Sequence, residues 1–474
     1  MFNFDYSYLS LPKRFYSKTK PSINNLSKIF ISNHKLYNDL NIIYNEEKLI
    51  DELLKKKYYE KSFSQAYAGH QFGHFTKLGD GRAIILGEHI TNQNKRFDIQ
   101  LKGGGKTKYS RNGDGKATFG SMLKEYLISE AMHHLKIPTS RCLALIKTGE
   151  IINRELEEDG SILVRVMKSH LRIGTFQYAA YFGLSNDLKK ITSYSIKRLY
   201  PKIETSENPA LELLEIVMKQ QIDLVVNWMR VGFIHGVMNT DNTSITGESF
   251  DYGPCAFINS YDPFKVYSSI DYNGRYAFGN QPNIIKWNIL RFAEALLPII
   301  NQNKKISIQM AQSIVDKFDK IWMKKYYSMM LKKIGIKKCK KNLHTLIDEL
   351  LTIMKKQKLD YNNTFYLLSQ KNKNSFIYHN DDFKNWITKW ETFLKTNTSE
   401  QDAKNLMEKY NPVVIPRNHM VDHAIKEATN GNITPYEKLL EVLSRPYNYN
   451  NSMIEFMNPP SENFEKCFQT FCGT

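Results

Sequence analysis

The sequence predicts an α+β protein of two lobes: a strand-rich N-terminal lobe with one key helix, and a large, mainly helical C-terminal lobe. Three observations support this prediction. The chain has 474 residues, which corresponds to about three domain-equivalents or to two large lobes. Between residues 66 and 115 glycine is frequent and the hydrophobic pattern is that of strands. From residue 208 onward, apolar residues recur at helical spacing over long segments.

The N-terminal lobe is predicted from a hairpin and the helix that follows it. The turn TNQNK separates two strand-like runs, AIILGEHI and RFDIQLKG, and Pro138 ends the helix. The expected elements are strands at 83–90, from 96, at 143–146 and at 162–167, and a helix at 118–135. We therefore assign residues 1–60 to an extension that packs on the core and residues 61–175 to the strand-rich lobe.

The C-terminal lobe, residues 176–474, is predicted from helix signals. Asn208 can cap a helix and Pro209 suits its first position. Later helices are expected at 285–300, 307–332, 342–357, 381–395 and 435–443. The lysine-rich segment 304–358 carries apolar residues at helical spacing, which predicts helices with a solvated face and leaves their role open.

The composition excludes several classes of protein. Hydrophobic residues are 42% and charged residues 24% of the chain, close to the globular average, which excludes a disordered chain and a collagen-like fibre. The longest apolar stretch, residues 284–300, is interrupted by Lys286, Arg291 and Glu294, so no membrane span is expected. The N-terminus lacks the basic and apolar regions of a secretory signal, so we expect a cytoplasmic protein.

The net charge of +18 is a weak indication of nucleic-acid binding. Of the 66 basic residues only 14 are arginine, whereas direct readers of bases and phosphates rely on arginine forks. We therefore expect no specific nucleic-acid partner, although attraction to acidic partners is consistent with the charge.

The five cysteines do not form a metal or disulfide framework. They are scattered through the chain and none forms a CxxC pair, which argues against a zinc ribbon or a thioredoxin-type site. An odd and sparse set suits a reducing compartment. The five are Cys142, Cys255, Cys339, Cys467 and Cys472.

A strand lysine and a helix glutamate form the first chemical signal. Lys102 ends the strand DIQLKGGG, and Glu125 lies in the following helix. A lysine and glutamate so placed hold nucleotide phosphates in kinase-like folds, because the ammonium attracts phosphate and the carboxylate fixes its position. Two unrelated surface charges would give the same pattern.

Two glycine-rich segments flank these residues. LGDGRA contains Gly79, Gly81 and Arg82, and SRNGDGKA contains Asp114 and Gly115. Glycines let the backbone approach a phosphate, and a loop that opens a helix can present amide donors to an anion. Ordinary turns produce such segments as well.

The most specific local signal follows the long helix that begins at Pro209. Asp241 and Asn242 lie in a polar loop, and Asp251 follows in an Asp-Tyr-Gly after a predicted hairpin. This order parallels the catalytic loop and metal-binding Asp of kinases, and oxygen ligands of this kind suit Mg²⁺. Arg165 and Arg172, seven residues apart in RVMKSHLRIGTF, could converge on a phosphate.

These motifs occur in the order found in kinases, and their sequences resemble those of one family, the selenoprotein O or YdiU family. The resemblance runs from the N-terminal FDYSYLSLPKRFY to the terminal FCGT. It rests on YAGHQFG, LGDGRA, IQLKGGGKTKYSRNGDGKA, LKEYLISEAMHHLKIPTSR, RVMKSHLRIGTF, HGVMNTDNTSI, DYGPCAFINSYDP and NPVVIPRNHMVDHAI. Strings this long and specific make chance agreement negligible.

The resemblance implies a protein-kinase-like pseudokinase fold and a protein adenylyltransferase, which transfers AMP from ATP to Ser, Thr or Tyr hydroxyls. It implies that ATP binds in a flipped orientation and that pyrophosphate leaves. By resemblance, Asp241 is the proton acceptor, and Asn242 and Asp251 bind Mg²⁺ or Mn²⁺. Nucleotide contacts and their positioning are implied for Gly79, Gly81, Arg82, Lys102, Asp114, Gly115, Glu125, Arg165, Arg172 and Asp251.

Three alternatives stay open. The same enzyme could use UTP with Mn²⁺ to attach UMP. A conventional kinase is disfavoured because Thr240, not an HRD tripeptide, precedes Asp241. A catalytically silent nucleotide-binding scaffold is disfavoured because the chain keeps all five candidate residues: Lys102, Glu125, Asp241, Asn242 and Asp251.

The cysteines depart from the family pattern. Some family members are controlled by a disulfide between the C-terminal cysteine and one in the activation segment. In this chain Tyr267 occupies the activation-segment position, so control through that pair is in doubt. Whether Cys255, Cys467 or Cys472 gives redox control is left open, as are the protein substrates and the oligomeric state.

Overall fold

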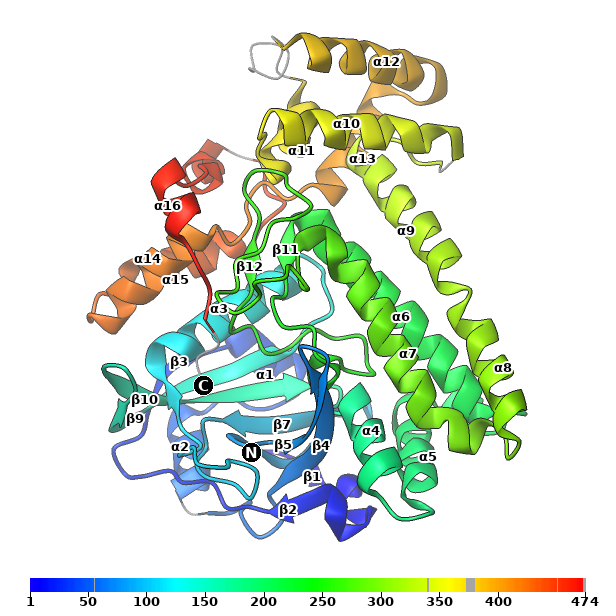
Figure 1. Cartoon of the computed structure of the whole chain (residues 1–474). Helices are drawn as coiled ribbons and strands as arrows, with labels where there is room; N and C mark the ends of the chain where they lie inside the picture. The colour runs from blue at the N-terminus through cyan, green and yellow to red at the C-terminus, as the bar shows by residue number, and fades with distance from the viewer. Residues whose placement is uncertain (55, 339–340, 372–379, 450, 472–474) are drawn as a thin grey trace.

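The computed structural model describes residues 1–54, 56–338, 341–371, 380–449 and 451–471. A lobe built around one sheet lies against a larger lobe of helices (Figure 1). The predicted α+β class, with a strand-rich N-terminal lobe and a mainly helical C-terminal lobe, is confirmed. In the described ranges of the chain, none of the helices combines the length and the apolar character needed to cross a bilayer.

The sheet of the first lobe is antiparallel and takes in strands from the very start of the chain. Its central order is β2-β4-β6-β7-β10-β9-β3, with β1 on β6, β5 on β4 and β8 on β10. The strands are β1 (Phe4–Asp5), β2 (Tyr16–Lys18), β3 (Lys28–Ser32), β4 (Phe63–Gln71), β5 (His74–Gly79), β6 (Ala83–Ile90), β7 (Arg96–Lys102), β8 (Ala117–Thr118), β9 (Arg141–Asn153) and β10 (Glu157–Met167). The predicted hairpin of β6 and β7 is present.

Side chains along β7 alternate between the apolar core on one face of the sheet and the candidate site on the other. Ile99 and Leu101 point to the face covered by α1 (His34–Asp39) and α2 (Glu46–Leu54), where they join a buried apolar cluster. Gln100 and Lys102 point to the other face, because successive residues of a strand alternate. The same rule gives Arg165 on β10 the same orientation, opposite Gln100 in the register.

Helix α3 (Phe119–His134) crosses that second face of the sheet and joins the two lobes. Its apolar residues belong to the large core that continues into the helical lobe. The predicted helix at 118–135 is therefore present. Tyr436 Oη, from the far end of the chain, donates a hydrogen bond to the Leu123 carbonyl at 2.9 Å, which ties α3 to α15 (Thr434–Leu443).

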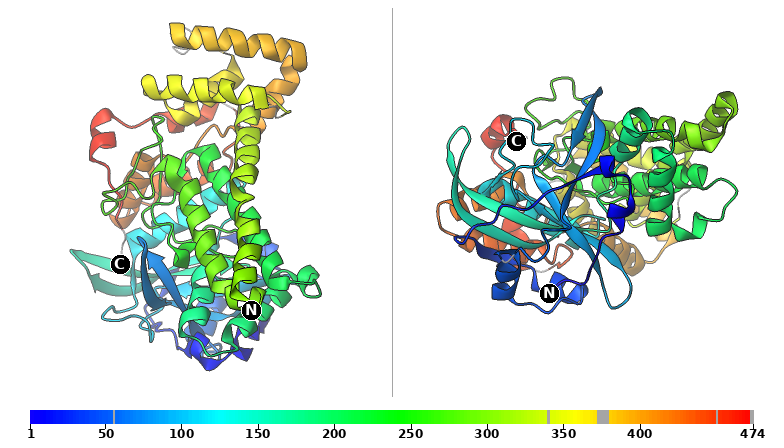
Figure 2. Two further views of the ribbon diagram at one scale, coloured as in Figure 1. Left: turned by 45° about the vertical axis from the view of Figure 1, so that its right-hand side comes forward. Right: turned by 90° about the horizontal axis from the view of Figure 1, so that it is seen from below.

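The helical lobe is built on α6 and α7, which lie side by side in both lateral views (Figures 1 and 2). Its helices are α4 (Ile173–Phe182), α5 (Asp187–Leu199), α6 (Pro209–Val231), α7 (Gln281–Ile300), α8 (Lys304–Val315), α9 (Phe318–Lys333), α10 (His344–Lys356), α11 (Tyr361–Gln370), α12 (Asp381–Asn397), α13 (Glu400–Tyr410), α14 (Asn418–Thr429), α15 (Thr434–Leu443) and α16 (Glu462–Cys467). Asn208 caps α6 by accepting from Leu211 N at 3.1 Å.

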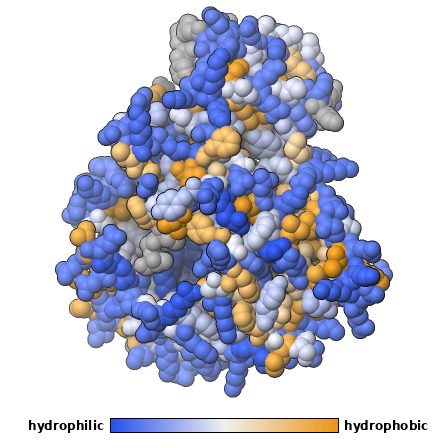
Figure 3. All heavy atoms as spheres, viewed as in Figure 1, coloured by the Kyte–Doolittle hydropathy of each residue, from blue (hydrophilic) through white to orange (hydrophobic). Residues whose placement is uncertain are grey.

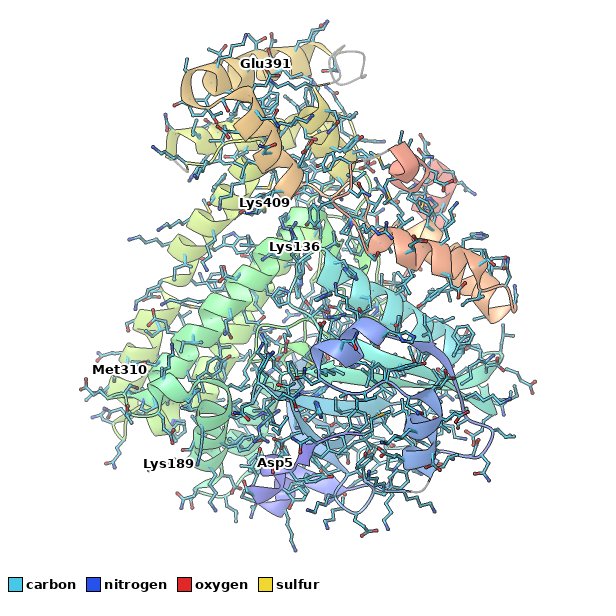
Figure 4. The ribbon with its side chains drawn as sticks, turned by 180° about the vertical axis from the view of Figure 1, so that it is seen from behind. Asp5, Lys136, Lys189, Met310, Glu391 and Lys409 are labelled. Atoms are coloured by element: carbon cyan, nitrogen blue, oxygen red, sulfur yellow. The ribbon has the colours of Figure 1, made fainter. Side chains whose placement is uncertain are left out.

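One helix prediction is wrong. The expected single helix at 307–332 is two helices, α8 and α9, because the chain breaks at Asp316 and Lys317. The break lets α8 pack on α7 while α9 runs back along α6 (Figure 2). Seen from behind, Met310 of α8 lies toward the strand-rich end and Glu391 of α12 marks the opposite end (Figure 4).

Two short segments bring the chain back between the lobes. After α6, the hairpin of β11 (Phe233–Ile234) and β12 (Ala256–Phe257) frames the short 3-10 helix η4 (Thr240–Asn242). The C-terminal tail returns past α16 to the same place, where Thr470 N donates to the Tyr267 carbonyl at 2.8 Å. In Figure 1 the last part of the tail runs down toward the sheet.

Candidate active site

A cavity of about 1050 Å³ lies between the two lobes. Every residue that the sequence predicts for the site, except Gly79, lines it. These residues are Gly81, Arg82, Lys102, Asp114, Gly115, Glu125, Arg165, Arg172, Asp241, Asn242 and Asp251. The volume is of the size that small-molecule and cofactor sites use.

Four side chains form a closed ring of opposite charges on the cavity wall. Lys102 Nζ donates to Glu125 Oε2 at 2.6 Å and to Asp251 Oδ1 at 2.6 Å. Arg165 Nη2 donates to the same two carboxylates, 2.6 Å from Asp251 Oδ1. Each cation therefore touches both carboxylates, and the four formal charges cancel. Because the carboxylate of Glu125 is held on both sides, both cations are fixed in position.

This ring keeps its carboxylates ionised. Burial alone raises the pKa of Asp251, but the nearby charges of Arg165 and Lys102 outweigh it and hold that pKa well below its usual range. The same two cations lower the pKa of Glu125 against its own burial. Two charged acids are thus maintained in a place where an isolated acid would take up a proton.

Arg172 is a third buried cation, at the start of α4. Its guanidinium carbon lies 4.1 Å from the ring centroid of Tyr67 and 5.1 Å from that of Phe250. Its Nη1 donates to the Asp241 carbonyl at 3.1 Å, and its Nη2 lies 3.6 Å from Asp80 Oδ1. Two aromatic faces, the main-chain carbonyls of His170 and Asp241 and the carboxylate of Asp80 hold this arginine in place.

Asp241 is held in η4 by strand β4. A Cβ atom on Gly69 would lie 2.2 Å from Asp241 Oδ1, so only glycine allows the strand to pass the carboxylate this closely. The next residue, His70, donates its N–H to Thr240 Oγ1 at 2.8 Å. The loop therefore cannot shift relative to the sheet without breaking this contact.

The carboxylate of Asp241 is available for chemistry. In the part of the chain that the structure describes, its Oδ1 is buried and accepts no hydrogen bond. Burial raises the pKa of Asp241 to about 6, although Arg172 acts to lower it. A carboxylate with such a pKa is ionised at neutral pH and more basic than an exposed one, as a proton acceptor requires.

Asn242 and Asp251 offer oxygen donors for a divalent cation. The Asn242 amide nitrogen donates to the Val237 carbonyl at 3.2 Å, which leaves its oxygen free to turn toward the cavity. Both cations of the ring bind Oδ1 of Asp251, so Oδ2 is the atom left for a further partner. No group of three His, Cys, Asp or Glu side chains in the described ranges could hold a metal alone. The donor set suits Mg²⁺ that takes its other ligands from phosphate and water.

The glycine-rich loops close one side of the cavity. Gly115 has a φ of +72°, and a Cβ there would lie 2.1 Å from the Gly105 carbonyl oxygen, so the turn needs glycine. Asp114 is exposed and bound by Arg154 at 3.0 and 2.9 Å. Gly79 lies at the end of β5, where a Cβ would fall on the ring of Tyr109, so it shapes the loop from outside the cavity.

Several residues of the site have contacts that the sequence motifs did not indicate. Asp80, in the centre of LGDGRA, is buried beside Arg172 and accepts from Gln65 N at 3.0 Å. Gly69 in YAGHQFG controls the approach to Asp241. Their glycine-rich motifs were the available signals, but nothing in them reveals the contact partners. The tail residues 468–471 also line the cavity, and no sequence feature indicated that.

The cysteines that the structure describes, Cys142, Cys255 and Cys467, are free thiols. Tyr267 contacts the tail directly: its hydroxyl donates to Glu465 Oε1 at 2.8 Å and its ring lies 5.6 Å from that of Phe468. Cys255 is a free, buried thiol, and burial raises its pKa to about 11. Cys467 is free and exposed. Cys472 lies outside the described residues, so its role stays a prediction.

Comparison with known proteins finds relatives that cover nearly the whole chain. The family model described as "Protein adenylyltransferase SelO" matches residues 1–444. A Pelagibacter ubique protein named "Protein nucleotidyltransferase YdiU" is 49% identical over 481 residues, covering 100% of this chain and 99% of its own. Proteins of the same name from Clostridium perfringens and Bacillus cereus are 46% and 45% identical, each covering 100% of this chain and 98% of its own.

Among solved structures, one is described as ROP2 from Toxoplasma gondii, a virulence factor with a protein-kinase fold and no enzymatic activity. It aligns with 76% of this chain and 96% of its own at 10% identity, with a TM-score of 0.26. The kinase-like character of this chain is supported by its own geometry, the lysine of β7 paired with the glutamate of α3 in the first lobe and the aspartates at the hairpin of the second. With the family match over nearly the whole length, the chain belongs to the SelO/YdiU family of protein nucleotidyltransferases.

Proposed function

We propose that the protein is an AMPylator, transferring AMP from ATP to Ser, Thr or Tyr hydroxyls of other proteins and releasing pyrophosphate, with ATP bound in the flipped orientation. One observation carries the proposal. Lys102, Arg165 and Arg172 are the cavity's buried cations, and all three lie next to Asp241 or Asp251. Three buried cations match the β- and γ-phosphates of a nucleotide whose triphosphate points inward.

The arrangement supports attack at the α-phosphorus. The hydroxyl oxygen forms a bond to that phosphorus, the bond to the bridging oxygen of pyrophosphate breaks, and the hydroxyl proton passes to Oδ1 of Asp241. Lys102 and Arg165 stabilise charge on the departing pyrophosphate, and Glu125 keeps both in place. Arg172 neutralises a further phosphate oxygen. A divalent cation, Mg²⁺ or Mn²⁺, held by Asn242 and Asp251 would neutralise charge on the phosphates during transfer.

The remaining predicted residues complete the nucleotide site. Gly81, Arg82, Asp114 and Gly115 line the side of the cavity nearer its glycine-rich loops, where they would surround the nucleoside part. The apolar side chains of Met122, Ile128, Val421 and Ile425 also line the cavity and offer no donor pattern specific for adenine. UTP therefore remains the second nucleotide to test. The free thiols fit a reducing compartment such as the cytoplasm.

The test is a paired label transfer. Purified protein, Mg²⁺ or Mn²⁺ and a generic protein acceptor receive ATP labelled on the α-phosphate in one reaction and on the γ-phosphate in the other. We expect label on protein from α-labelled ATP alone. Asp251→Ala and Asp241→Asn should abolish it, while Asp381→Ala, a change at a side chain that is 93% exposed on α12, should retain it.

The other outcomes are equally informative. Label from γ-labelled ATP alone would make the protein a kinase and refute the flipped orientation. Label from UTP in place of ATP would assign UMP transfer. Binding of ATP without label transfer from either nucleotide would assign a silent scaffold.

A further inference from the structure

An exposed aromatic surface lies outside the nucleotide cavity, at the end of α4 and on β5. We call Phe75, Tyr181, Phe182 and Leu184 the aromatic platform; their exposed fractions lie between 37% and 63%. The ring centroid of Phe75 is 5.0 Å from that of Tyr181 and 5.8 Å from that of Phe182. Hydrophobic side chains gather on the face that carries β4 and α4 (Figure 3). Contiguous exposed apolar groups of this kind mark interaction sites.

Cations border this platform. Lys77 Nζ lies 5.3 Å from the ring centroid of Phe182. The Arg275 and Arg291 guanidinium carbons lie 4.8 and 5.1 Å from the Trp287 ring. Arg291 pairs with Glu294, but in the described part of the chain neither Lys77 nor Arg275 forms an ion pair with a carboxylate. At Lys77 and Arg275 the border therefore presents positive charge that the described residues leave without an acidic partner.

His70 makes the platform and its border one surface. Its ring centroid lies 4.8 Å from that of Phe75 and 5.1 Å from that of Trp287. A continuous path of contacts thus runs from Arg275 through Trp287, His70 and Phe75 to the end of α4.

Both elements under this surface are anchored to the loop that carries the proton acceptor. Phe72 N, in the β4–β5 turn, donates to Asn239 Oδ1 at 3.1 Å. Ile173 N, at the start of α4, donates to the Thr243 carbonyl at 2.9 Å. These contacts reach the chain on both sides of Asp241. The surface therefore keeps a fixed position beside the acceptor carboxylate, and none of the platform residues lines the nucleotide cavity.

We propose that this surface binds the protein substrate, through a segment that carries acidic side chains and an aromatic or large apolar side chain near its acceptor hydroxyl. The inference rests on the proposed function, because it assigns the substrate class for that same site. The apolar side chain would pack on the platform and the acidic ones would pair with Lys77 and Arg275. A second copy of this chain is a poor occupant, since two molecules of net charge +18 repel each other.

The experiment uses two short synthetic peptides of equal length with one Tyr acceptor. One has Glu and Phe beside the acceptor, and the other has Lys and Ser. Binding to the full-length protein is measured by fluorescence anisotropy, and AMP transfer by α-label incorporation. We expect the acidic peptide to bind and react at least about fivefold better, because an exposed ion pair and a buried aromatic contact both contribute.

Variants on the surface assign the effect. Lys77→Glu should raise KM for the acidic peptide about fivefold with kcat and ATP binding unchanged. The double variant Tyr181→Ser/Phe182→Ser should weaken binding about tenfold. Lys320→Glu on α9 and Ile308→Ser on α8 change the same kinds of exposed side chain on other helices, and both should match the unmodified protein.

Equal binding of the two peptides, or equal losses in Lys77→Glu and Lys320→Glu, would overturn the inference. So would a dimer that Lys77→Glu dissociates in sedimentation, or a single-stranded oligonucleotide that displaces the acidic peptide. The anisotropy measurement does not depend on catalysis. If no nucleotide is transferred yet the acidic peptide binds through Lys77, the proposed function fails and the substrate-binding surface stands. If AMP is transferred but the acidic peptide does not bind through Lys77, the surface is rejected and the proposed function stands.

Discussion

The charge ring of Lys102, Glu125, Arg165 and Asp251 gives a quantitative prediction. Replacing Arg165 by Met leaves the buried carboxylate of Glu125 and the partly buried one of Asp251 facing one cation, since the Arg165 side chain is only 2% exposed and touches both. Removing one partner of a buried ion pair costs about 3–5 kcal/mol. For a chain of 474 residues the entropy of unfolding is about 1 kcal/mol per kelvin, so the melting temperature should fall by about 3–5 °C.

A second substitution tests whether charge balance is the cause. Glu125→Gln in the Arg165→Met background removes one negative charge and leaves Lys102 paired with Asp251, so we expect about half of the lost melting temperature to return. Arg445→Met, which breaks an exposed pair with Glu441, should change the melting temperature by less than about 1 °C. Both Arg165 variants should lose AMP transfer, which separates stability from function.

The pH dependence gives an independent check on the same reasoning. Without Arg165 the burial of Glu125 is opposed by Lys102, and that of Asp251 by Lys102 and the more distant Arg172, so the pKa of one carboxyl must rise. Arg165→Met should then be least destabilised in mildly acidic buffer, where that carboxyl takes up a proton, and most destabilised at neutral pH. Charge imbalance is not the cause if the double variant melts at or below the single variant, or if the loss of melting temperature in Arg165→Met is the same at both pH values.

Three further outcomes are expected. Gly69→Ala would place a methyl group 2.2 Å from Asp241 Oδ1, so kcat should fall about 100-fold with little change in ATP affinity; an unchanged kcat would contradict the close approach. Burial raises the pKa of Glu248 to about 7 from an ordinary 4.5, so the folded state holds a proton there that the unfolded state has lost. Its contribution to stability is therefore full below about pH 4.5 and is lost as the pH rises to 7, a change of about 3 kcal/mol that Glu248→Gln should remove in melting curves across this range. Iodoacetamide at neutral pH should label the exposed Cys467 and spare the buried Cys255, as peptide mapping would show; equal labelling would mean that Cys255 is accessible.

The sequence predicted the architecture where local patterns are strong. The strand from Arg96, the helix that carries Glu125 and the cap of Asn208 all occur as expected, because alternation, helical period and capping are local signals. The break at Asp316 and Lys317 escaped prediction because neither residue is a helix breaker. The turn is imposed by packing against α6 and α7, which a local pattern does not contain.

The sequence predicted which residues form the site better than it predicted how they contact one another. The motifs identified Lys102, Glu125, Arg165 and Asp251, but not that one arginine would touch both carboxylates. That contact depends on the register of β10 against β7, which is set by pairing across the sheet. The tail at Thr470 is held at the cavity by hydrogen bonds with Tyr267, Ser269 and Pro254, and such long-range pairing leaves no trace in local composition.

The two aspartates of the second lobe show why geometry decides their roles. Both are aspartates, ten residues apart in the chain; Asp241 is buried, and the Asp251 side chain is 26% exposed. Lys102 and Arg165 each reach Asp251 at 2.6 Å and hold its pKa well below the usual range, which makes it a permanent anion suited to bind cations. Arg172 reaches Asp241 only through its main-chain carbonyl, so burial prevails and raises that pKa to about 6. Environments that separate the pKa values of two like groups suit one to bind a cation and the other to accept a proton, which are the roles proposed for Asp251 and Asp241. Because both residues are aspartates, the difference between their proposed roles comes from their surroundings and not from the residue type.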